Sequence, residues 1–297
     1  MRLHDDQLPV TAEVVAGLVV QQFPQWSHLP VRPVDADGTV NAIFRIGDRL
    51  AARLPLQAQD AGRARAQLES EAAAADELAA CSAVPTPVPV ALGAPGPGYP
   101  MFWIVQTWLP GDTAMGADVG LSSAFADDLA TLIAGLRGAD TRGRRFTGPG
   151  RGGHLPDHDA WMETCFERST ALLDVAPLRR LWRGFRALPP GGPEVMTHGD
   201  LVPGNLLVRD GRLVGLLDGG GFGPADPALD LVCAWHLLDP APRQLLADRL
   251  GCGEIEWARG MAWSFQQAMG LVWYYAETRP ALSRLGRRTL ERLLDAA

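Results

Sequence analysis

Residues 197–208 read THGDLVPGNLLV and residues 216–219 read LLDG, and these two segments carry most of what the sequence says about structure and chemistry. Moving a phosphoryl group from a nucleotide to an alcohol requires one carboxylate that orients the hydroxyl and accepts its proton. It also requires hard oxygen ligands that hold Mg²⁺ on the phosphates. Asp200 suits the first role, and Asn205 and Asp218 suit the second.

The segment between these residues predicts a β-hairpin. Residues 206–208 and 213–217 are short apolar runs, and the Asp-Gly pair between them is a strong turn signal. Such a hairpin returns the second aspartate to the end where Asn205 lies. Each element alone is common in ordinary turns and loops, but their coincidence at these offsets favours a catalytic loop with a metal ligand.

With these motifs in place, the chain resembles the aminoglycoside phosphotransferase family, antibiotic and small-molecule kinases that share the protein-kinase fold. The resemblance rests on His198-Gly199-Asp200 with Asn205, on Asp218, and on GPADPALDL at residues 223–231. It implies an α+β, protein-kinase-like bilobal fold. A small antiparallel-sheet N-terminal lobe would occupy residues 1–107, and a larger, mainly helical C-terminal lobe residues 108–297.

Carried over residue by residue, the resemblance implies that Asp200 is the catalytic base or hydroxyl-orienting group. Asn205 and Asp218 are implied as the magnesium ligands, with ATP or GTP as the phosphoryl donor. Protein kinases carry an arginine where this chain has Gly199, and that arginine pairs with an activation-loop phosphate. Its absence predicts a site that is assembled constitutively.

Three further residues are expected to support the site. His198 precedes the catalytic aspartate in the resembled motif. Asp226 is expected to be structural, and Asp230 is expected to cap a helix that starts at Leu231. Residues 219–223 read GGGFG and lack the aromatic residue that usually follows the metal-binding aspartate, which predicts a flexible segment.

The chain contains no lysine, so the strand lysine that normally holds the nucleotide phosphates has no counterpart. Residues 40–54 read as two strands around a Gly-Asp turn, and Arg53 falls at the lysine position. An arginine guanidinium can grip two phosphate oxygens at once. The alternative is that Arg53 is a surface charge at a strand end, because no strict spacing rule applies here.

The acidic partner of this strand cation is expected on the next helix. Residues 67–81 are alanine-rich and helical by propensity. Glu71 lies where the resembled family pairs a glutamate with the strand cation, and Glu69 and Glu77 are competing candidates.

Two further segments complete the predicted nucleotide site. A turn would cover the phosphates with backbone N–H groups from Gly38 to Asn41 and with the hydroxyl of Thr39, although an ordinary turn explains these residues nearly as well. In the resembled fold, a hinge from Gln106 to Trp108 would offer backbone groups to the purine base. The sequence leaves the choice between adenine and guanine open.

Periodicity in the rest of the chain predicts one more strand and a helical second half. Residues 142–154 are rich in glycine and arginine and predict a solvated loop. Aromatic residues recur in the later helices, where a cluster could wall a substrate cleft. The expected strand covers residues 101–106, and the expected helices cover residues 122–138, 159–173, 178–188, 231–238 and 256–278.

Composition limits the possible functions. The 297 residues carry a formal net charge of −7, which argues against nucleic acid as the main partner. The chain has no apolar run long enough to span a bilayer and no signal-peptide core at its N-terminus, so we expect a cytoplasmic protein. We expect its four scattered cysteines to be reduced core residues. The oligomeric state has no mark in the sequence.

The acceptor is the least defined part of the prediction. From Pro240 onward the chain carries more arginines than acids, which favours a neutral or weakly charged acceptor, such as a macrolide or nucleoside, over a polycationic one. The favoured function is phosphorylation of an antibiotic hydroxyl. The alternatives are a metabolic kinase for a sugar or amino alcohol, and a nucleotide-binding protein without catalysis.

Overall fold

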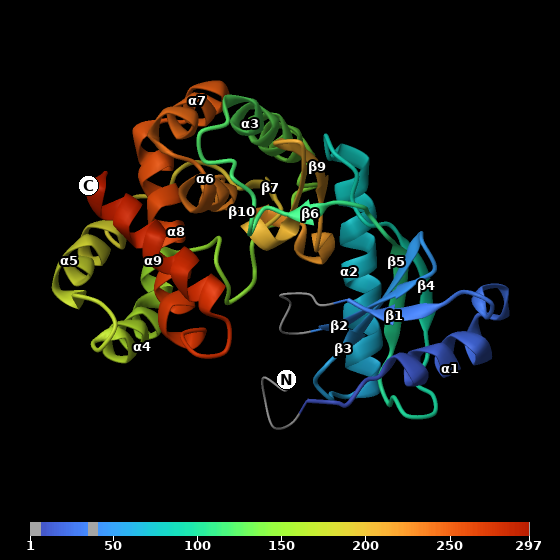
Figure 1. Ribbon diagram of the computed structural model, residues 1–297. Coiled ribbons are helices and arrows are strands. Elements are labelled where there is room, and N and C mark those ends of the chain that lie inside the picture. Colours follow the sequence, from blue (N-terminus) through green and yellow to red (C-terminus); the bar gives the residue numbers. More distant parts are fainter. Residues whose placement is uncertain (1–6, 35–40, 297) are drawn as a thin grey trace. The chain divides into compact units, whose positions relative to one another are not determined.

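The computed structural model describes residues 7–34 and 41–296 (Figure 1), and contacts divide the chain into two compact units. The first unit contains residues 1–80, 85–110 and 215–221, and the second contains residues 81–84, 111–214 and 222–297. The first unit therefore reaches three residues beyond the predicted lobe boundary. It also takes up the short segment that carries Asp218.

The first unit is built on an antiparallel sheet of five strands in the order β1-β2-β3-β5-β4. The Gly-Asp turn between β2 and β3 is present as predicted, and Gly47 adopts a φ of 58° there, which is favourable only for glycine. The strands are β1 Val31–Pro33, β2 Asn41–Ile46, β3 Leu50–Pro55, β4 Pro89–Gly93 and β5 Trp103–Thr107, and the helices are α1 Ala12–Gln22 and α2 Ala61–Cys81.

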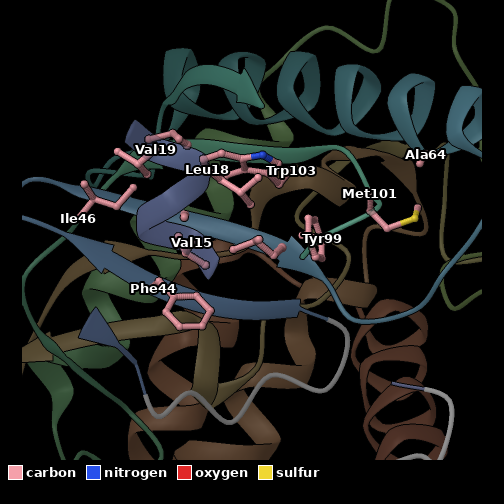
Figure 2. Close-up of a cluster of buried hydrophobic side chains, with 12 residues drawn as sticks. Val15, Leu18, Val19, Phe44, Ile46, Ala64, Tyr99, Met101 and Trp103 are labelled. Atoms are coloured by element: carbon pink, nitrogen blue, oxygen red, sulfur yellow. The ribbon is translucent and has the colours of Figure 1, made fainter. Parts of the chain in front are cut away.

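The core of the first unit lies where α1 packs on the sheet, as Figure 2 shows. Thr11 starts α1 by accepting a hydrogen bond from the backbone of Val14, and the apolar residues Val15, Leu18 and Val19 then fall on one helical face. Opposite this face lie Phe44 and Ile46 of β2, Trp103 of β5, and Tyr99 and Met101 of the segment that precedes β5.

The second unit is mainly helical, with two small sheets. Helix α8 is its central element, because Phe265 on α8 contacts aromatic rings on both α4 and α5. The helices are α3 Ser123–Arg137, α4 Asp159–Ser169, α5 Val175–Phe185, α6 Val232–Leu237, α7 Pro240–Leu250, α8 Glu254–Tyr274 and α9 Pro280–Asp295. The sheets pair β7 Val195–Thr197 with β10 Gly223–Ala225, and join β6 Asp112–Thr113, β8 Leu206–Arg209 and β9 Arg212–Leu216.

Most of the predicted elements are present, with shifted ends. The hairpin after the catalytic loop is confirmed as β8 and β9, and each predicted helix has a counterpart. Helix α2 begins six residues earlier than predicted, while α1, α7 and α9 were not predicted. Cys165 and Cys233 are buried, whereas Cys81 and Cys252 are only partly buried. Within the described residues, no helix is both long and apolar enough to cross a membrane.

A pair of glycines in the first unit tests this packing. A Cβ at Gly93 would lie 2.1 Å from Cε2 of the fully buried Trp103, so we expect Gly93→Ala to destabilise the protein by about 1–3 kcal/mol through overpacking. Gly17 is an exposed position inside α1 with open space around its Cα, so Gly17→Ala should stabilise by about 0.5–1 kcal/mol. Urea unfolding of both variants measures the difference, and equal effects would contradict the packing described here.

Candidate functional site

The predicted catalytic loop of the second unit is held by its own hydrogen bonds. Asn205 Nδ2 donates to the backbone oxygen of Asp200 at 2.9 Å and lies 3.3 Å from the carboxylate Oδ2 of the same residue. A short 3-10 turn, Pro203–Asn205, places the amide there. Because the NH₂ end of Asn205 faces Asp200, its amide oxygen remains available as a ligand for a hard cation.

A buried carboxylate fixes the backbone that precedes Asp200. Asp230 Oδ2 accepts from the backbone N–H of His198 at 2.9 Å, and Oδ1 accepts from the backbone N–H of Gly199 at 3.1 Å. Gly199 has a φ of 81°, which a residue with a side chain would adopt only under strain. Burial raises the pKa of Asp230, while these hydrogen bonds act to lower it.

The prediction that Asp230 caps a helix is therefore wrong. Asp230 lies inside a short 3-10 turn, Leu229–Leu231, and helix α6 begins one residue after that turn, without a side-chain cap. The carboxylate points instead to the catalytic loop. A carboxylate directly before an expected helix suits an N-cap on sequence grounds, and the long-range contact that competes for it leaves no local signal.

Asp226, four residues earlier, lies in a buried ionic cluster. Its carboxylate accepts from Arg259 Nε at 2.7 Å, from Arg259 Nη2 at 2.6 Å and from the indole Nε1 of Trp263 at 2.7 Å. Both members of the ion pair are about 95% buried. The backbone N–H of Asp226 donates to the carbonyl of Gly152 at 2.8 Å, so this cluster also anchors the glycine-rich loop.

The interpretation of residues 142–154 as a solvated loop is wrong for residues 151–153, near its C-terminal end. Arg151 places Nη2 2.5 Å from Oδ1 of Asp200, and its side chain is only 20% exposed. Gly152 has a φ of 111° and packs so closely on Ala225 that a Cβ would lie 2.7 Å from the Cβ of that residue. The sequence indicated a loop, but no spacing rule linked Arg151 to Asp200.

A second residue that sequence reasoning missed contacts the same oxygen. Gln267 Nε2, on α8, lies 3.2 Å from Oδ1 of Asp200. Oδ1 therefore receives donors from both Arg151 and Gln267, whereas Oδ2 has the longer contact with Asn205. The two carboxylate oxygens of Asp200 are not equivalent.

The predicted strand cation lies in an ionic cluster of the first unit. Arg53 Nη2 is 2.9 Å from Oδ1 of Asp218, and Arg53 Nη1 is 3.6 Å from Oε2 of Glu71. The side-chain amide of Asn41, oriented with its oxygen as acceptor, lies 2.9 Å from Arg53 Nε and 3.0 Å from Nη2. Glu69, the competing partner, pairs instead with Arg65 at 2.8 Å.

The glycines after Asp218 pack closely on α2. A Cβ at Gly219 would lie 2.3 Å from Cδ2 of Leu78, and a Cβ at Gly220 would lie 3.0 Å from the Cβ of Glu71. The predicted flexible segment begins as a short 3-10 turn, Gly219–Gly221, seated against α2. Asp218 itself has a φ of 59°, which is uncommon for a residue with a side chain.

A cavity of the first unit unites several of the predicted nucleotide-binding residues. Gln106 on β5 lines it together with the ionic cluster, whereas Trp108 does not. The lining residues are Arg53, Glu71, Ala72, Ala75, Pro87, Pro89, Ile104, Gln106, Asp218, Gly219 and Gly220. Gly38 and Thr39 of the predicted phosphate-covering turn lie outside the described residues.

The predicted hinge differs from expectation in its hydrogen bonding. The backbone N–H of Thr107 donates to Val88 at 2.9 Å, and the backbone N–H of Trp108 donates to Arg49 at 2.8 Å. Both donors are thus used within the sheet and are not available to a base in this conformation. The side chain of Trp108 packs against Arg45, whose guanidinium carbon lies 5.2 Å from the centroid of the indole ring.

The residues present fit Mg²⁺ only when a nucleotide supplies further ligands. Among the residues that the structure describes, no three His, Cys, Asp or Glu side chains gather as a metal cage. Mg²⁺ typically takes one or two protein oxygens and completes its shell with phosphates and water. The carboxylate of Asp218 and the amide oxygen of Asn205 are donors of this kind.

The chain is similar to known phosphotransferases in sequence. The family model described as "Phosphotransferase enzyme family" matches residues 31–263. Over 63 residues the chain is 38% identical to an aminoglycoside 3'-phosphotransferase of Escherichia coli, a match that covers 21% of this chain and 23% of that protein. The match thus spans less than a quarter of the curated relative.

Similarity in fold extends over nearly the whole chain. The GDP complex of wild-type aminoglycoside 2'-phosphotransferase-IIIa has a TM-score of 0.73 and 18% identity, and the alignment covers 97% of this chain and 100% of that one. For macrolide 2'-phosphotransferase MphH from Brachybacterium faecium the TM-score is 0.61 at 19% identity, with coverage of 95% and 98%. At these identities the likeness concerns the fold, and it confirms the predicted fold class.

The buried ion pair at Asp226 yields a stability prediction. Arg259→Met would leave the Asp226 carboxylate buried without its cation, so we expect a loss of about 3–5 kcal/mol in unfolding free energy. In the control Arg65→Met, the pair with Glu69 is exposed, and the loss should stay below about 1 kcal/mol. Chemical denaturation measures both, and a small effect at Arg259 would remove Asp226 as an anchor of the glycine-rich loop.

Proposed function

Because the chain belongs to the phosphotransferase enzyme family, we propose that it moves the γ-phosphate of a nucleoside triphosphate to a hydroxyl of a small molecule, and that this molecule is an antibiotic. The observation that carries the proposal is the pairing of Asp200 with Asn205 in one hydrogen-bonded loop. The carboxylate of Asp200 only accepts hydrogen bonds and therefore suits a hydroxyl donor. The amide oxygen of Asn205 faces away from Asp200 and suits a cation bound to phosphate.

Asp200 orients the acceptor hydroxyl and accepts its proton as the oxygen attacks phosphorus. Such proton transfer is effective only when the carboxylate is held within hydrogen-bond reach of the hydroxyl. The contacts of Oδ1 with Arg151 and Gln267 restrict rotation of the carboxylate. Oδ2 is therefore the oxygen that meets the acceptor.

The first unit supplies the nucleotide side of the reaction. Arg53 replaces the absent lysine and holds phosphate oxygens through its two Nη atoms, with Glu71 and Asn41 fixing its guanidinium. Asn205 and Asp218 would hold Mg²⁺, which neutralises charge on the transferring phosphate. Arg53 also pairs with Asp218, so the cation lies beside the proposed metal ligand of the first unit.

Two classes of antibiotic acceptor have support from relatives, namely aminoglycosides and macrolides, as the names of these proteins state. The position of Arg151 favours the second. Its guanidinium lies against Asp200, where the ammonium groups of an aminoglycoside would meet like charge. We therefore propose a neutral or weakly charged acceptor with sugar hydroxyls.

The central test is a mass-spectrometric transfer assay with Mg²⁺, ATP or GTP, and a panel of aminoglycosides, macrolides, nucleoside antibiotics, sugars and amino alcohols. Asp200→Asn should lower the rate of phosphoryl transfer by about 10²–10⁴-fold, because the amide cannot accept the proton. Asp210→Asn, in the exposed hairpin turn, is the matched control and should keep the wild-type rate. Transfer to a sugar or amino alcohol alone would favour a metabolic kinase. Nucleotide binding without transfer to any acceptor would favour a non-catalytic protein.

The role of Arg53 is tested by nucleotide affinity. Arg53→Met should weaken binding of Mg²⁺-nucleotide by about 10–100-fold, because charge-assisted hydrogen bonds to phosphate are lost. Arg53→Lys should recover part of the affinity, since it restores the charge without the two-pronged grip. Arg32→Met, an exposed position on β1 of the same sheet, serves as the control. Calorimetric titration gives the affinities. Unchanged nucleotide affinity in Arg53→Met would indicate that Arg53 is only a surface charge at a strand end.

A further inference from the structure

A hydrogen-bonded chain of side chains crosses three helices of the second unit and ends on Asp200. His236 on α6 is 3% exposed, and its Nδ1 lies 2.7 Å from the hydroxyl of Thr289 on α9. Its Nε2 lies 2.9 Å from Oε1 of Gln267 on α8. Gln267 Nε2 in turn lies 3.2 Å from Oδ1 of Asp200. None of the sequence motifs points to His236, Gln267 or Thr289.

The chemistry of the end member fixes the direction of the hydrogen bonds that Gln267 makes. An ionised carboxylate only accepts, so Gln267 must present its NH₂ group to Asp200. The amide oxygen of Gln267 then faces His236, which must carry its proton on Nε2. The remaining ring nitrogen, Nδ1, then accepts from the hydroxyl of Thr289, whose other acceptor within reach is the backbone oxygen of Leu285 at 2.9 Å. Burial lowers the pKa of His236 to about 4, so the imidazole is neutral at pH 7 and one tautomer satisfies both neighbours.

Reversal of the Gln267 amide is opposed at its Asp200 end. It would place the amide oxygen against the carboxylate of Asp200, so that two acceptors face each other. It would also bring the NH₂ group against Nε2 of His236, and the ring could avoid two facing donors only by moving its proton to Nδ1. Because His236 is buried, water cannot readily repair a mismatch there, and an unsatisfied buried polar group costs about 1–3 kcal/mol. The orientation of the amide is therefore the one that couples Asp200 to the Nε2-protonated form of His236.

We propose that Gln267 is a positioning residue for Asp200, and that His236 and Thr289 fix the orientation of its amide so that Oδ1 is bound to the scaffold and Oδ2 is presented to the acceptor hydroxyl. This inference rests on the proposed function. It gives α6, α8 and α9 a role in positioning the carboxylate of Asp200. Arg151 contacts the same oxygen from the glycine-rich loop and contributes a positive charge, whereas the Gln267 amide contributes a hydrogen bond of fixed orientation.

Adjacent glutamines on α8 provide the decisive comparison. Gln267→Leu removes the donor to Asp200, and we expect kcat to fall about 10–100-fold with the KM values for acceptor and nucleotide changed less than about 3-fold. Gln266→Leu removes a glutamine of the same helix whose amide lies 3.3 Å from Nδ1 of His158 and does not reach Asp200. That control should lower the melting temperature while kcat stays at the wild-type value. Equal kcat in the two variants would overturn the proposal.

A conservative pair at His236 separates positioning from mere stability. His236→Gln places an amide nitrogen near the former Nε2 and should retain most of kcat. His236→Asn reaches only the Nδ1 position and should lose kcat as Gln267→Leu does. Both substitutions disturb the same buried site, so a purely structural role would give similar losses of melting temperature and no difference in kcat. That result would contradict the relay.

A readout independent of turnover keeps this inference distinct from the proposed function. Nitrogen-15 NMR of the imidazole should show a neutral ring protonated on Nε2 at pH 7, and a ring protonated on Nδ1 or on both nitrogens would overturn the proposal. If the wild-type protein transfers phosphate to no acceptor, the proposed function fails. The positioning role is then judged by this tautomer and by a crystal structure of Gln267→Leu, in which the carboxyl group of Asp200 should be rotated from its wild-type position.

Discussion

The second unit depends on two carboxylates that are removed from water within five residues of one another. Asp226 is compensated by the guanidinium of Arg259 and the indole of Trp263, and Asp230 by two backbone N–H groups. Because a buried carboxylate is tolerated only when its oxygens are hydrogen-bonded, each one dictates where its partners must lie. Asp226 thereby holds the loop that carries Arg151. Asp230 holds the backbone that leads into Asp200, so both supports of the Asp200 carboxylate originate in one short segment.

Arginine takes the place of lysine throughout this chain, and in each unit one arginine contacts a carboxylate of the proposed site. Arg53 contacts Asp218 in the first unit, and Arg151 contacts Asp200 in the second. A guanidinium is planar, permanently charged and able to donate in two directions at once. It can therefore rest on a carboxylate and still keep donors for another group, such as the Glu71 carboxylate that lies beside Arg53. A lysine ammonium at these positions would not offer that geometry.

The parts of the proposed site that could be predicted are those that depend on local spacing. Asp200 and Asn205 are five residues apart, and short-range turn chemistry alone places the Asn205 amide beside Asp200. The hairpin that follows them was predicted from its Asp-Gly turn. Arg53 and Glu71 could be proposed from strand and helix patterns. Arg151, Gln267 and His236 could not, because each meets its partner through tertiary packing of segments that are distant in sequence. Asp230 was assigned wrongly for the same reason. An aspartate before a helix looks the same in sequence whether it caps that helix or accepts hydrogen bonds from a distant segment, here the backbone of His198 and Gly199.

The close packing of Gly219 and Gly220 on α2 gives the first unit a mechanical property. The backbone after Asp218 lies so close to Leu78 and Glu71 that a Cβ at Gly219 or Gly220 would displace one of these side chains. Densely packed interiors transmit displacements between neighbouring elements. We therefore expect helix α2 and the segment after Asp218 to move together. A shift of the helix along its axis would then also move the carboxylate of Asp218.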